Sequence, residues 1–344
     1  MSPRDRTAAA PDPAETPKER HESVTVSFII PALNEERHIG QCLRAIQNVQ
    51  LPSAACGIEV IVVDNHSSDR TAELGRENGA RVVDVTPGSP SRARNAGARL
   101  TSGEWLAFVD ADCVLAPDWL MICSAHLLTD PNAIGAAGVM RAPSDDQSWV
   151  EKSMYQLAHG GRAVEAKAVA WLPTFNLLVR RSAFESVGGF DESLTTCEDC
   201  DLGYKLARLG NLIIDPRTTA AHHGASHSLG QLFRREAWRS QGNARLAVSR
   251  PFDWSNWLSL LVPPGIIGGF ALSAAGFLAA ISAGWPSWPW LIAMAIFPLL
   301  VTGIVLRKAG FTGVTSFVKQ CAVLTTYFAG RAAGLFWPFR RVNR

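Results

Sequence analysis

The chain has 344 residues, which is long enough for two domains, and its formal net charge is only +2. A charge this small argues against a general nucleic-acid-binding surface. Residues 1–250 have the composition of an ordinary soluble domain, whereas the chain becomes strongly hydrophobic from Trp257 onward. The seven cysteines stand at irregular spacings, which indicates reduced thiols rather than a disulfide framework.

The composition divides the chain into three expected parts. Residues 1–22 contain Pro, Ala and charges with no apolar period, so we predict a disordered tail. This tail has no apolar stretch of signal-peptide length, which favours a cytoplasmic globular part. We expect a catalytic domain at 23–250 and a membrane domain at 251–344.

The predicted elements begin at Val24, with a strand over residues 24–30 that Pro31 ends. Apolar residues then recur at helical spacing over 39–49, and Asn34 is predicted to cap that helix. The remaining elements alternate, with strands at 58–63, 81–85 and 106–109 and a helix at 91–100. This alternation predicts an α/β fold with a doubly wound, mostly parallel sheet.

Two carboxylates follow the last of these strands, in the stretch EWLAFVDADC. Asp110 and Asp112 fall on the same side of an extended chain, because the strand period is two residues. They stand at the carboxyl end of a strand, where open α/β sheets bind their ligands. Paired carboxylates of this kind can hold Mg²⁺ or Mn²⁺, which in turn binds a diphosphate. The alternative is a polar strand end that caps the next helix.

Other polar residues follow the other predicted strands. Asn34 and Glu35 follow the first strand, and Asp64 follows the second. A carboxylate can accept the N–H donors of a base, and Arg94 can supply a cation to a phosphate. Each residue alone could be a turn or cap residue, but together they fit a nucleoside diphosphate. GxGxxG and P-loop patterns are absent from the sequence, which argues against the standard dinucleotide and NTPase folds.

A second acidic pair, Glu198 and Asp199, opens a predicted helix at 201–209. A carboxylate here could take the proton of an attacking hydroxyl. The helix N-terminus would favour the ionised form that a base requires. The alternative is that Glu198, Asp199 and Asp201 only stabilise the helix dipole.

Five sequence motifs follow one another along the chain: FIIPALNEE, VIVVDNHSSDRT, SRARNAGA, FVDADC and GGFDESLTTCEDCDLGYKLARLG. Over residues 24–245 the chain resembles the family 2 glycosyltransferases, which have a GT-A fold. The resemblance implies that a sugar is transferred from a nucleotide-sugar with inversion. A UDP-sugar is the first expected donor and a GDP-sugar the second. It implies that Asp112 is the closer metal ligand of the pair with Asp110, and that Asp199 is the catalytic base. It also implies a nucleotide pocket formed by Pro31, Ala32, Asn34, Glu35 and, at the base, Asp64.

Two further segments are assigned to the acceptor or diphosphate side. Asn176 precedes the GGFDE turn and is expected to touch the sugar or acceptor, or to make an internal hydrogen bond. The pair His222-His223 could add a metal or diphosphate contact, with His223 as the candidate ligand, or could be structural.

A basic segment near residue 231 resembles the QxxRW motif of processive members of the family. Arg235 occupies the position of the Trp, which favours a single transfer over polymerisation. Gln231, Arg234 and Arg235 are candidates to bind a diphosphate or an anionic head group. The alternative is a solvated basic helix face.

The last quarter of the chain is predicted to be membrane-associated. Residues 257–283 and 288–306 are each long enough to span ~30 Å of hydrocarbon. Arg307 and Lys308 place the return end on the cytoplasmic side, which gives a multi-pass cell-membrane protein. Residues 314–337 contain Lys319 and Arg331, so we predict an interfacial or re-entrant helix, with a third span as the alternative.

These expectations combine into one predicted activity. A metal-dependent hexosyltransferase would move a sugar to a hydroxyl of a lipid or lipid-linked glycan at the cytoplasmic membrane face. One alternative is a polyprenyl-phosphate glycosyltransferase, whose ionised acceptor needs no base. The other is a membrane-tethered protein that binds a nucleotide-sugar without turning it over.

Overall fold

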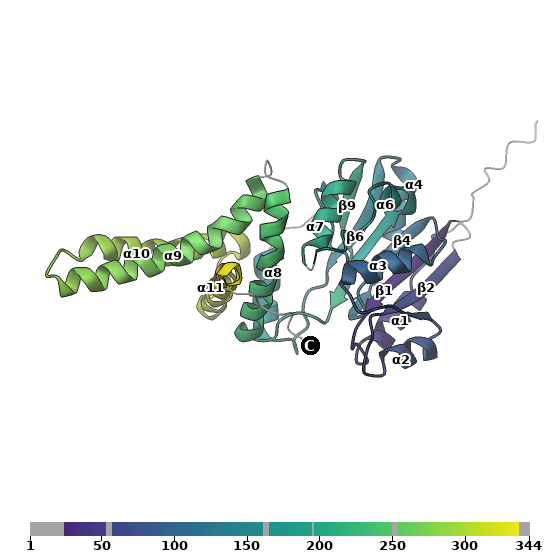
Figure 1. Ribbon diagram of the computed structural model, residues 1–344, viewed down its shortest axis with the longest axis horizontal. Helices are drawn as coiled ribbons and strands as arrows, with labels where there is room; N and C mark the ends of the chain where they lie inside the picture. The colour runs from purple at the N-terminus through teal and green to yellow at the C-terminus, as the bar shows by residue number, and fades with distance from the viewer. Residues whose placement is uncertain (1–23, 53–56, 161–164, 195, 250–253, 337–344) are drawn as a thin grey trace, which may run out of the picture.

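The computed structural model describes residues 24–52, 57–160, 165–194, 196–249 and 254–336. The tail predicted for residues 1–22 lies outside them. Within these residues, nine strands form one sheet, ordered β3-β2-β1-β4-β8-β6-β9-β5, with β7 paired to β9. Figure 1 shows helix α8 standing between this sheet and a long hairpin of α9 and α10, which projects away from it.

One half of the sheet is parallel. Its strands pair in the order β3-β2-β1-β4, and β1 and β4 are buried almost throughout. This half confirms the predicted parallel α/β arrangement. Its elements are β1 (Thr25–Ala32), α1 (Ile39–Gln47), β2 (Gly57–Asp64), α2 (Thr71–Glu77), β3 (Arg81–Asp84), α3 (Pro90–Arg99) and β4 (Trp105–Val109).

The other half of the sheet is mixed. Strand β8 runs antiparallel to both β4 and β6, while β6 and β9 are parallel. The short strand β7 pairs with β9 and runs antiparallel to it. The elements are β5 (Cys113–Leu115), α4 (Trp119–Thr129), β6 (Ala133–Met140), α5 (Trp149–His159), β7 (Lys167–Val169), β8 (Asn176–Arg180), α6 (Arg181–Ser186), α7 (Glu198–Leu206) and β9 (Asn211–His222).

Two local predictions about the end of β1 are wrong. Strand β1 does not end at Pro31 but continues to Ala32. Its pairing with β4 stops at Ile29, so the N–H that proline lacks is not needed on that side. Helix α1 begins only at Ile39, and Asn34 therefore does not cap it.

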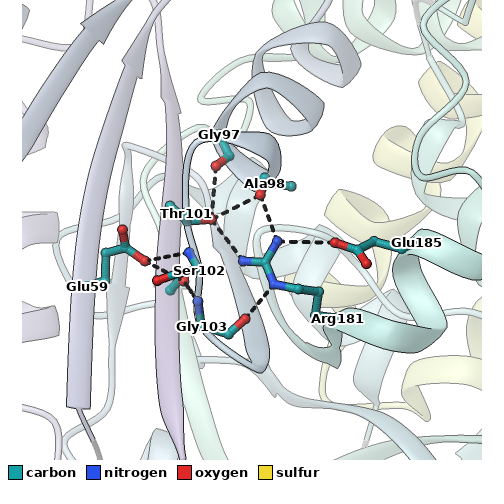
Figure 2. Close-up of polar contacts among 9 residues, drawn as sticks. Glu59, Gly97, Ala98, Thr101, Ser102, Gly103, Arg181 and Glu185 are labelled. Carbon is teal, nitrogen blue, oxygen red and sulfur yellow. Dashed lines mark hydrogen bonds and ion pairs between the residues drawn. The ribbon is translucent and has the colours of Figure 1, made fainter.

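The amino edge of the sheet is fastened by Arg181, as Figure 2 shows. Its guanidinium donates hydrogen bonds to the carbonyl oxygen of Gly103 at 2.6 Å and the hydroxyl of Thr101 at 3.1 Å. Glu59 accepts a hydrogen bond from the N–H of Ser102 at 3.0 Å. These contacts fix the loop that leads into β4, whose other end carries the aspartate pair.

The C-terminal part consists of helices. These are α8 (Leu229–Ser249), α9 (Trp254–Ser282), α10 (Trp288–Ala309) and α11 (Val314–Phe336). In the described part of the chain, two segments are long and apolar enough to cross a membrane by length and composition. They are Trp257–Ser282 and Trp288–Ala309, and only 11% of each apolar window is buried.

A hydrophobic core joins the sheet-bearing part of the chain to the C-terminal helices. It is built by α5 and α8 together with α10 and α11. A buried ion pair adds to it, because Arg331 Nε donates to Glu236 Oε2 at 2.8 Å. The apolar members are Val150, Leu157, Leu232, Val301, Val305, Val323, Leu324 and Phe328.

Helix α11 approaches α8 closely through Gly330 and Gly334. A Cβ atom added at Gly334 would lie 1.9 Å from the carbonyl oxygen of Ala237 and 2.1 Å from the hydroxyl of Ser240. We therefore expect Gly334→Ala to lower the free energy of unfolding by about 1–3 kcal/mol, because the two backbones must separate. The unfolding temperature in detergent micelles measures this.

The matched control is Gly303→Ala in α10. Nothing lies within 4 Å of a Cβ atom at Gly303. This substitution should leave the unfolding temperature unchanged or raise it, because alanine is the better helix former. Equal unfolding temperatures for the two variants would contradict the close packing of α8 on α11.

Candidate active site

The carboxyl edge of the parallel half carries the predicted nucleotide residues. Ala32 pairs with Asp64 at the ends of β1 and β2, and Asp110 follows the last residue of β4. Because β1 lies between the other two strands, Asp64 and Asp110 are two strand spacings apart, roughly 10 Å. The buried carboxylate of Asp64 accepts hydrogen bonds from the hydroxyl and the N–H of Ser67, at 2.5 Å and 3.2 Å. Asp64 thus also closes the turn after β2.

The loop after β1 is fastened to the loop after β2. Asn34 has a φ of 56°, and its side-chain oxygen accepts a hydrogen bond from the N–H of Ser68 at 2.9 Å. The N–H of Glu35 donates to the hydroxyl of Thr71 at 2.7 Å, and its carboxylate contacts His38 Nδ1 at 3.0 Å. Asn34 and Glu35 therefore form a fixed rim beside Asp64.

Arg94 joins the two acidic pairs. Its side chain is only 4% exposed, with Nη2 2.7 Å from Asp110 Oδ1 and Nη1 3.1 Å from Glu198 Oε1. Its guanidinium carbon also lies 5.5 Å from the ring centroid of Phe190. Burial alone would lower the pKa of Arg94, but the charges of Asp110 and Glu198 raise it above its ordinary value. The guanidinium predicted to meet a phosphate is held between two carboxylates.

Asp112 lies beside a histidine on β9. Pairing of β5 with β9 sets Cys113 opposite His222, and His222 Nε2 lies 3.6 Å from Asp112 Oδ1. The ligand atoms of Asp112, Cys113 and His222 all lie within 4.8 Å of one another. Burial lowers the pKa of His222 to about 4, so its imidazole is neutral at neutral pH.

The two neighbouring histidines have different surroundings in the structure. His223, the predicted metal ligand, stacks on His38 with ring centroids 5.4 Å apart. The imidazole of its neighbour His222 lies beside the Asp112 carboxylate, whereas His223 contacts Asp112 through its backbone N–H, 3.0 Å from the Asp112 carbonyl oxygen. Neutral imidazole and a buried carboxylate form a donor set that a divalent transition metal accepts.

Asp199 stands in the first turn of α7 and accepts a hydrogen bond from the N–H of Cys200 at 2.8 Å. Burial and the neighbouring charge of Glu198 raise the pKa of Asp199 to about 6. The sequence predicted the opposite direction from the helix N-terminus. Burial has the larger effect here, and the charges of Arg239 and Arg94 offset it only in part.

The residues predicted for the acceptor side separate in the structure. Asn176 is fully buried, and its oxygen accepts hydrogen bonds from the N–H of Gly138 at 2.8 Å and from the indole of Trp119 at 3.2 Å. This is the internal hydrogen-bonding role, so Asn176 does not line an open site.

The three candidate residues on α8 also have different surroundings. The side chain of Gln231 accepts a hydrogen bond from the N–H of His227 at 2.9 Å. Arg234 is exposed, whereas Arg235 donates to the carbonyl oxygen of Gly224 at 2.5 Å and lines a cavity.

That cavity, which we call the first cavity, lies between β9, α5 and α8 and has a volume of about 530 Å³. His222 is part of its wall, so it adjoins the aspartate pair. Sequence reasoning missed it, because its lining comes from segments far apart in the chain. Its apolar lining includes Met140, Ala142, Pro143, Met154 and Leu232, and its cationic lining is Arg141, Arg235 and Arg239.

Comparison with known proteins finds glycosyltransferases. Residues 27–188 match the family model described as Glycosyl transferase family 2. The pre-mycofactocin glycosyltransferase of Mycobacterium tuberculosis is 26% identical over 354 aligned positions, covering 97% of this chain and 69% of that protein. The beta-monoglucosyldiacylglycerol synthase of Trichormus variabilis is 30% identical over 198 residues, covering 53% of this chain and 41% of that protein.

A solved structure shows the same fold. The mannosyltransferase PcManGT of Pyrobaculum calidifontis, in complex with GDP-Man and Mn²⁺, superposes with a TM-score of 0.60. It is 22% identical and covers 89% of this chain and 88% of that chain. This likeness shows that the sheet has the GT-A fold. The family match identifies residues 27–188 as a family 2 glycosyltransferase domain.

Proposed function

We propose that this glycosyltransferase moves a sugar from a nucleoside-diphosphate donor to a hydroxyl of a lipid or lipid-linked acceptor, with inversion. The observation that carries the proposal is the double contact of Arg94 with Asp110 and Glu198. Arg94 links Asp110 of the aspartate pair to Glu198, the sequence neighbour of the candidate base Asp199. UDP-sugars are the first expected donors and GDP-sugars the second.

The donor set around Asp112 fits a divalent cation. Asp110, Asp112 and His222 would hold it, with oxygen ligands suited to Mg²⁺ or Mn²⁺ and an imidazole nitrogen that favours Mn²⁺. The bound cation would supply Lewis-acid stabilisation of the departing diphosphate. Mn²⁺ in the complex of the Pyrobaculum mannosyltransferase supports this choice.

The protein's own groups then have distinct tasks. Asp199 would accept the proton of the acceptor hydroxyl as its oxygen attacks the anomeric carbon. Attack from the face opposite the diphosphate inverts the anomeric configuration. Arg94 would hold Glu198 and Asp110 in place, and the fixed rim of Asn34 and Glu35 would border the nucleotide.

The first cavity is the proposed acceptor site. Its wall combines apolar side chains with three arginines and with the carboxylates of Asp146, Glu151 and Glu236, which suits an amphiphile with a polar head. The lipid in the name of the Trichormus relative supports a lipid acceptor. Residues 23–250 would be the catalytic domain, on the cytoplasmic side, and 251–344 the multi-pass membrane domain, with α11 at the interface.

The raised pKa of Asp199 predicts the pH dependence of transfer. A base must be ionised, so kcat/KM should fall as the pH drops through about 6, the pKa of Asp199. Glu198→Gln should move this acid limb to lower pH, because it removes a charge that raises the pKa of Asp199. Initial rates measured between pH 5 and 8 test this, and Glu185→Gln, at an exposed acid, is the control. An acid limb that stays in place in Glu198→Gln would contradict the assignment.

The test of the function uses purified full-length protein, nucleotide-sugars, Mn²⁺ or Mg²⁺, and membrane lipids as acceptors. We expect release of nucleoside diphosphate that requires both the cation and the lipid fraction. Binding of a donor with no release under any of these conditions would favour the alternative of a non-catalytic binding protein.

A substitution that fills the first cavity tests its role as the acceptor site. Met154 lines the cavity, so Met154→Trp should reduce lipid-dependent turnover while donor binding persists. The matched control is Met121→Trp, because Met121 is 42% exposed on α4 and does not line the cavity. Equal turnover in both variants would place the acceptor elsewhere.

A further inference from the structure

A second cavity, of about 500 Å³, lies where α5 meets the connection between α10 and α11. It shares no lining residue with the first cavity, although α5 contributes to both. Trp149, Lys152, Ser153 and Gln156 line it from α5. The connection and the start of α11 contribute Thr312, Gly313, Val314, Thr315, Ser316 and Lys319.

The lining of the second cavity suits a phosphate. It contains two lysines and several hydroxyl groups, and none of the described residues that line it is acidic. Lys319 Nζ lies 6.0 Å from the ring centroid of Trp149. Lys152 Nζ donates to the carbonyl oxygen of Asp145 at 2.7 Å, and the Asp145 carboxylate, 3.9 Å away, is fully exposed. Both ammonium groups can therefore still pair with an anion.

A buried amide holds the polar lining in place. Gln320 is fully buried, and its Nε2 donates to Gln156 Oε1 at 2.8 Å and to the hydroxyl of Ser316 at 3.2 Å. The hydroxyl of Thr312 contacts that of Ser316 at 3.0 Å. Among the described residues, Gln320 Oε1 has no hydrogen-bond partner. Gln320 thus fixes the positions of Gln156 and Ser316, which line the second cavity.

The second cavity lies at the basic end of a candidate membrane span. Helix α10 carries Arg307 and Lys308 in its last turn, and the cavity begins at Thr312. The end of α5 touches this turn, because a Cβ atom at Gly160 would lie 1.8 Å from the carbonyl oxygen of Lys308. Large apolar side chains beside the cavity are exposed, with Phe311 at 64% and Val318 at 58%.

We propose that the second cavity binds the phosphate of an anionic phospholipid head group, with Lys152 and Lys319 as its cations. Basic residues next to apolar residues at a bilayer surface attract anionic lipids. The inference rests on the membrane attachment in the proposed function but not on the catalytic assignment. Because α5 lines both cavities, a lipid bound here would hold the wall of the acceptor site at the bilayer surface.

The test is thermal unfolding of the full-length protein in neutral detergent with added phosphatidylglycerol, phosphatidylcholine or inorganic phosphate. A ligand that binds the folded state raises the unfolding temperature by mass action. We expect phosphatidylglycerol to raise it more than phosphatidylcholine does. The double variant Lys152→Gln/Lys319→Gln should lose most of that difference, whereas Lys152→Arg/Lys319→Arg should keep it.

A control variant and three contrary outcomes complete this test. Lys167→Gln, at an exposed lysine on β7 outside the cavity, should behave as wild type. An equal phosphatidylglycerol effect in wild type and the double glutamine variant, or none in wild type, would overturn the site. Stabilisation by inorganic phosphate equal to that by the lipid would overturn the lipid source. None of these readouts needs a sugar donor, so failed catalysis would leave the result intact.

Discussion

Asp199→Asn is expected to reduce transfer to a hydroxyl acceptor by about 10²–10⁴-fold, the usual contribution of a general base. The amide keeps the size of the side chain but cannot take the proton at an operating pH near 7. Donor binding should be nearly unchanged, because the cation and nucleotide are assigned to other residues. Initial rates at saturating donor, together with the donor Kd, separate the two effects.

Asp201→Asn is the matched control for this prediction. Asp201 stands in the same first turn of α7, but its carboxylate lies 2.7 Å from Lys205 Nζ. It should therefore lose far less activity than Asp199→Asn. If Asp199→Asn instead retains most of its turnover with an acceptor that carries a phosphate, the polyprenyl-phosphate alternative is the correct one. The three arginines of the first cavity are compatible with that outcome.

Asp112→Asn is expected to weaken cation-dependent donor binding by at least about 10–100-fold, which is the cost of losing even an outer-shell group of a metal site. The buried Asp112 carboxylate lies beside His222, so an amide there would remove the charged ligand. Titration of the nucleoside diphosphate with and without Mn²⁺ measures the loss.

Two histidine variants sharpen this prediction. His222→Gln should weaken Mn²⁺-dependent binding, whereas His223→Gln should not, because the imidazole of His222 lies beside the Asp112 carboxylate and that of His223 stacks on His38. The two residues are neighbours in sequence and differ in their surroundings, so each serves as the control for the other. Equal effects would remove His222 from the proposed cation site.

The parallel half of the sheet was predictable from sequence for a physical reason. Strands covered on both faces consist of apolar runs, and their helices show a clear helical period. The two apolar C-terminal segments likewise form helices, α9 and α10. Strand β9 was missed because Asp215 and Pro216 lie within it, and both residue types are rare in strands.

The site was predictable only in part, because its long-range pairings leave no local signal. Adjacent residues on a strand point to opposite faces, so sequence alone does not decide between His222 and His223. The pairing of β5 with β9 decides it. From the sequence, Arg94 cannot be told from an exposed arginine on a helix. Only the fold shows that its partners are Asp110 and Glu198. Asn176 accepts its hydrogen bonds from Trp119 and Gly138, which are distant in sequence.

The most direct test of the account is the position of Mn²⁺ in crystals grown with a nucleoside diphosphate, located by anomalous diffraction. The account predicts an anomalous peak within bonding distance of the Asp112 carboxylate, about 2.0–2.6 Å, with His222 beside it and Asp199 facing the same cleft. A peak bound by other residues, or Asp199 on a surface that the nucleotide does not share, would contradict it.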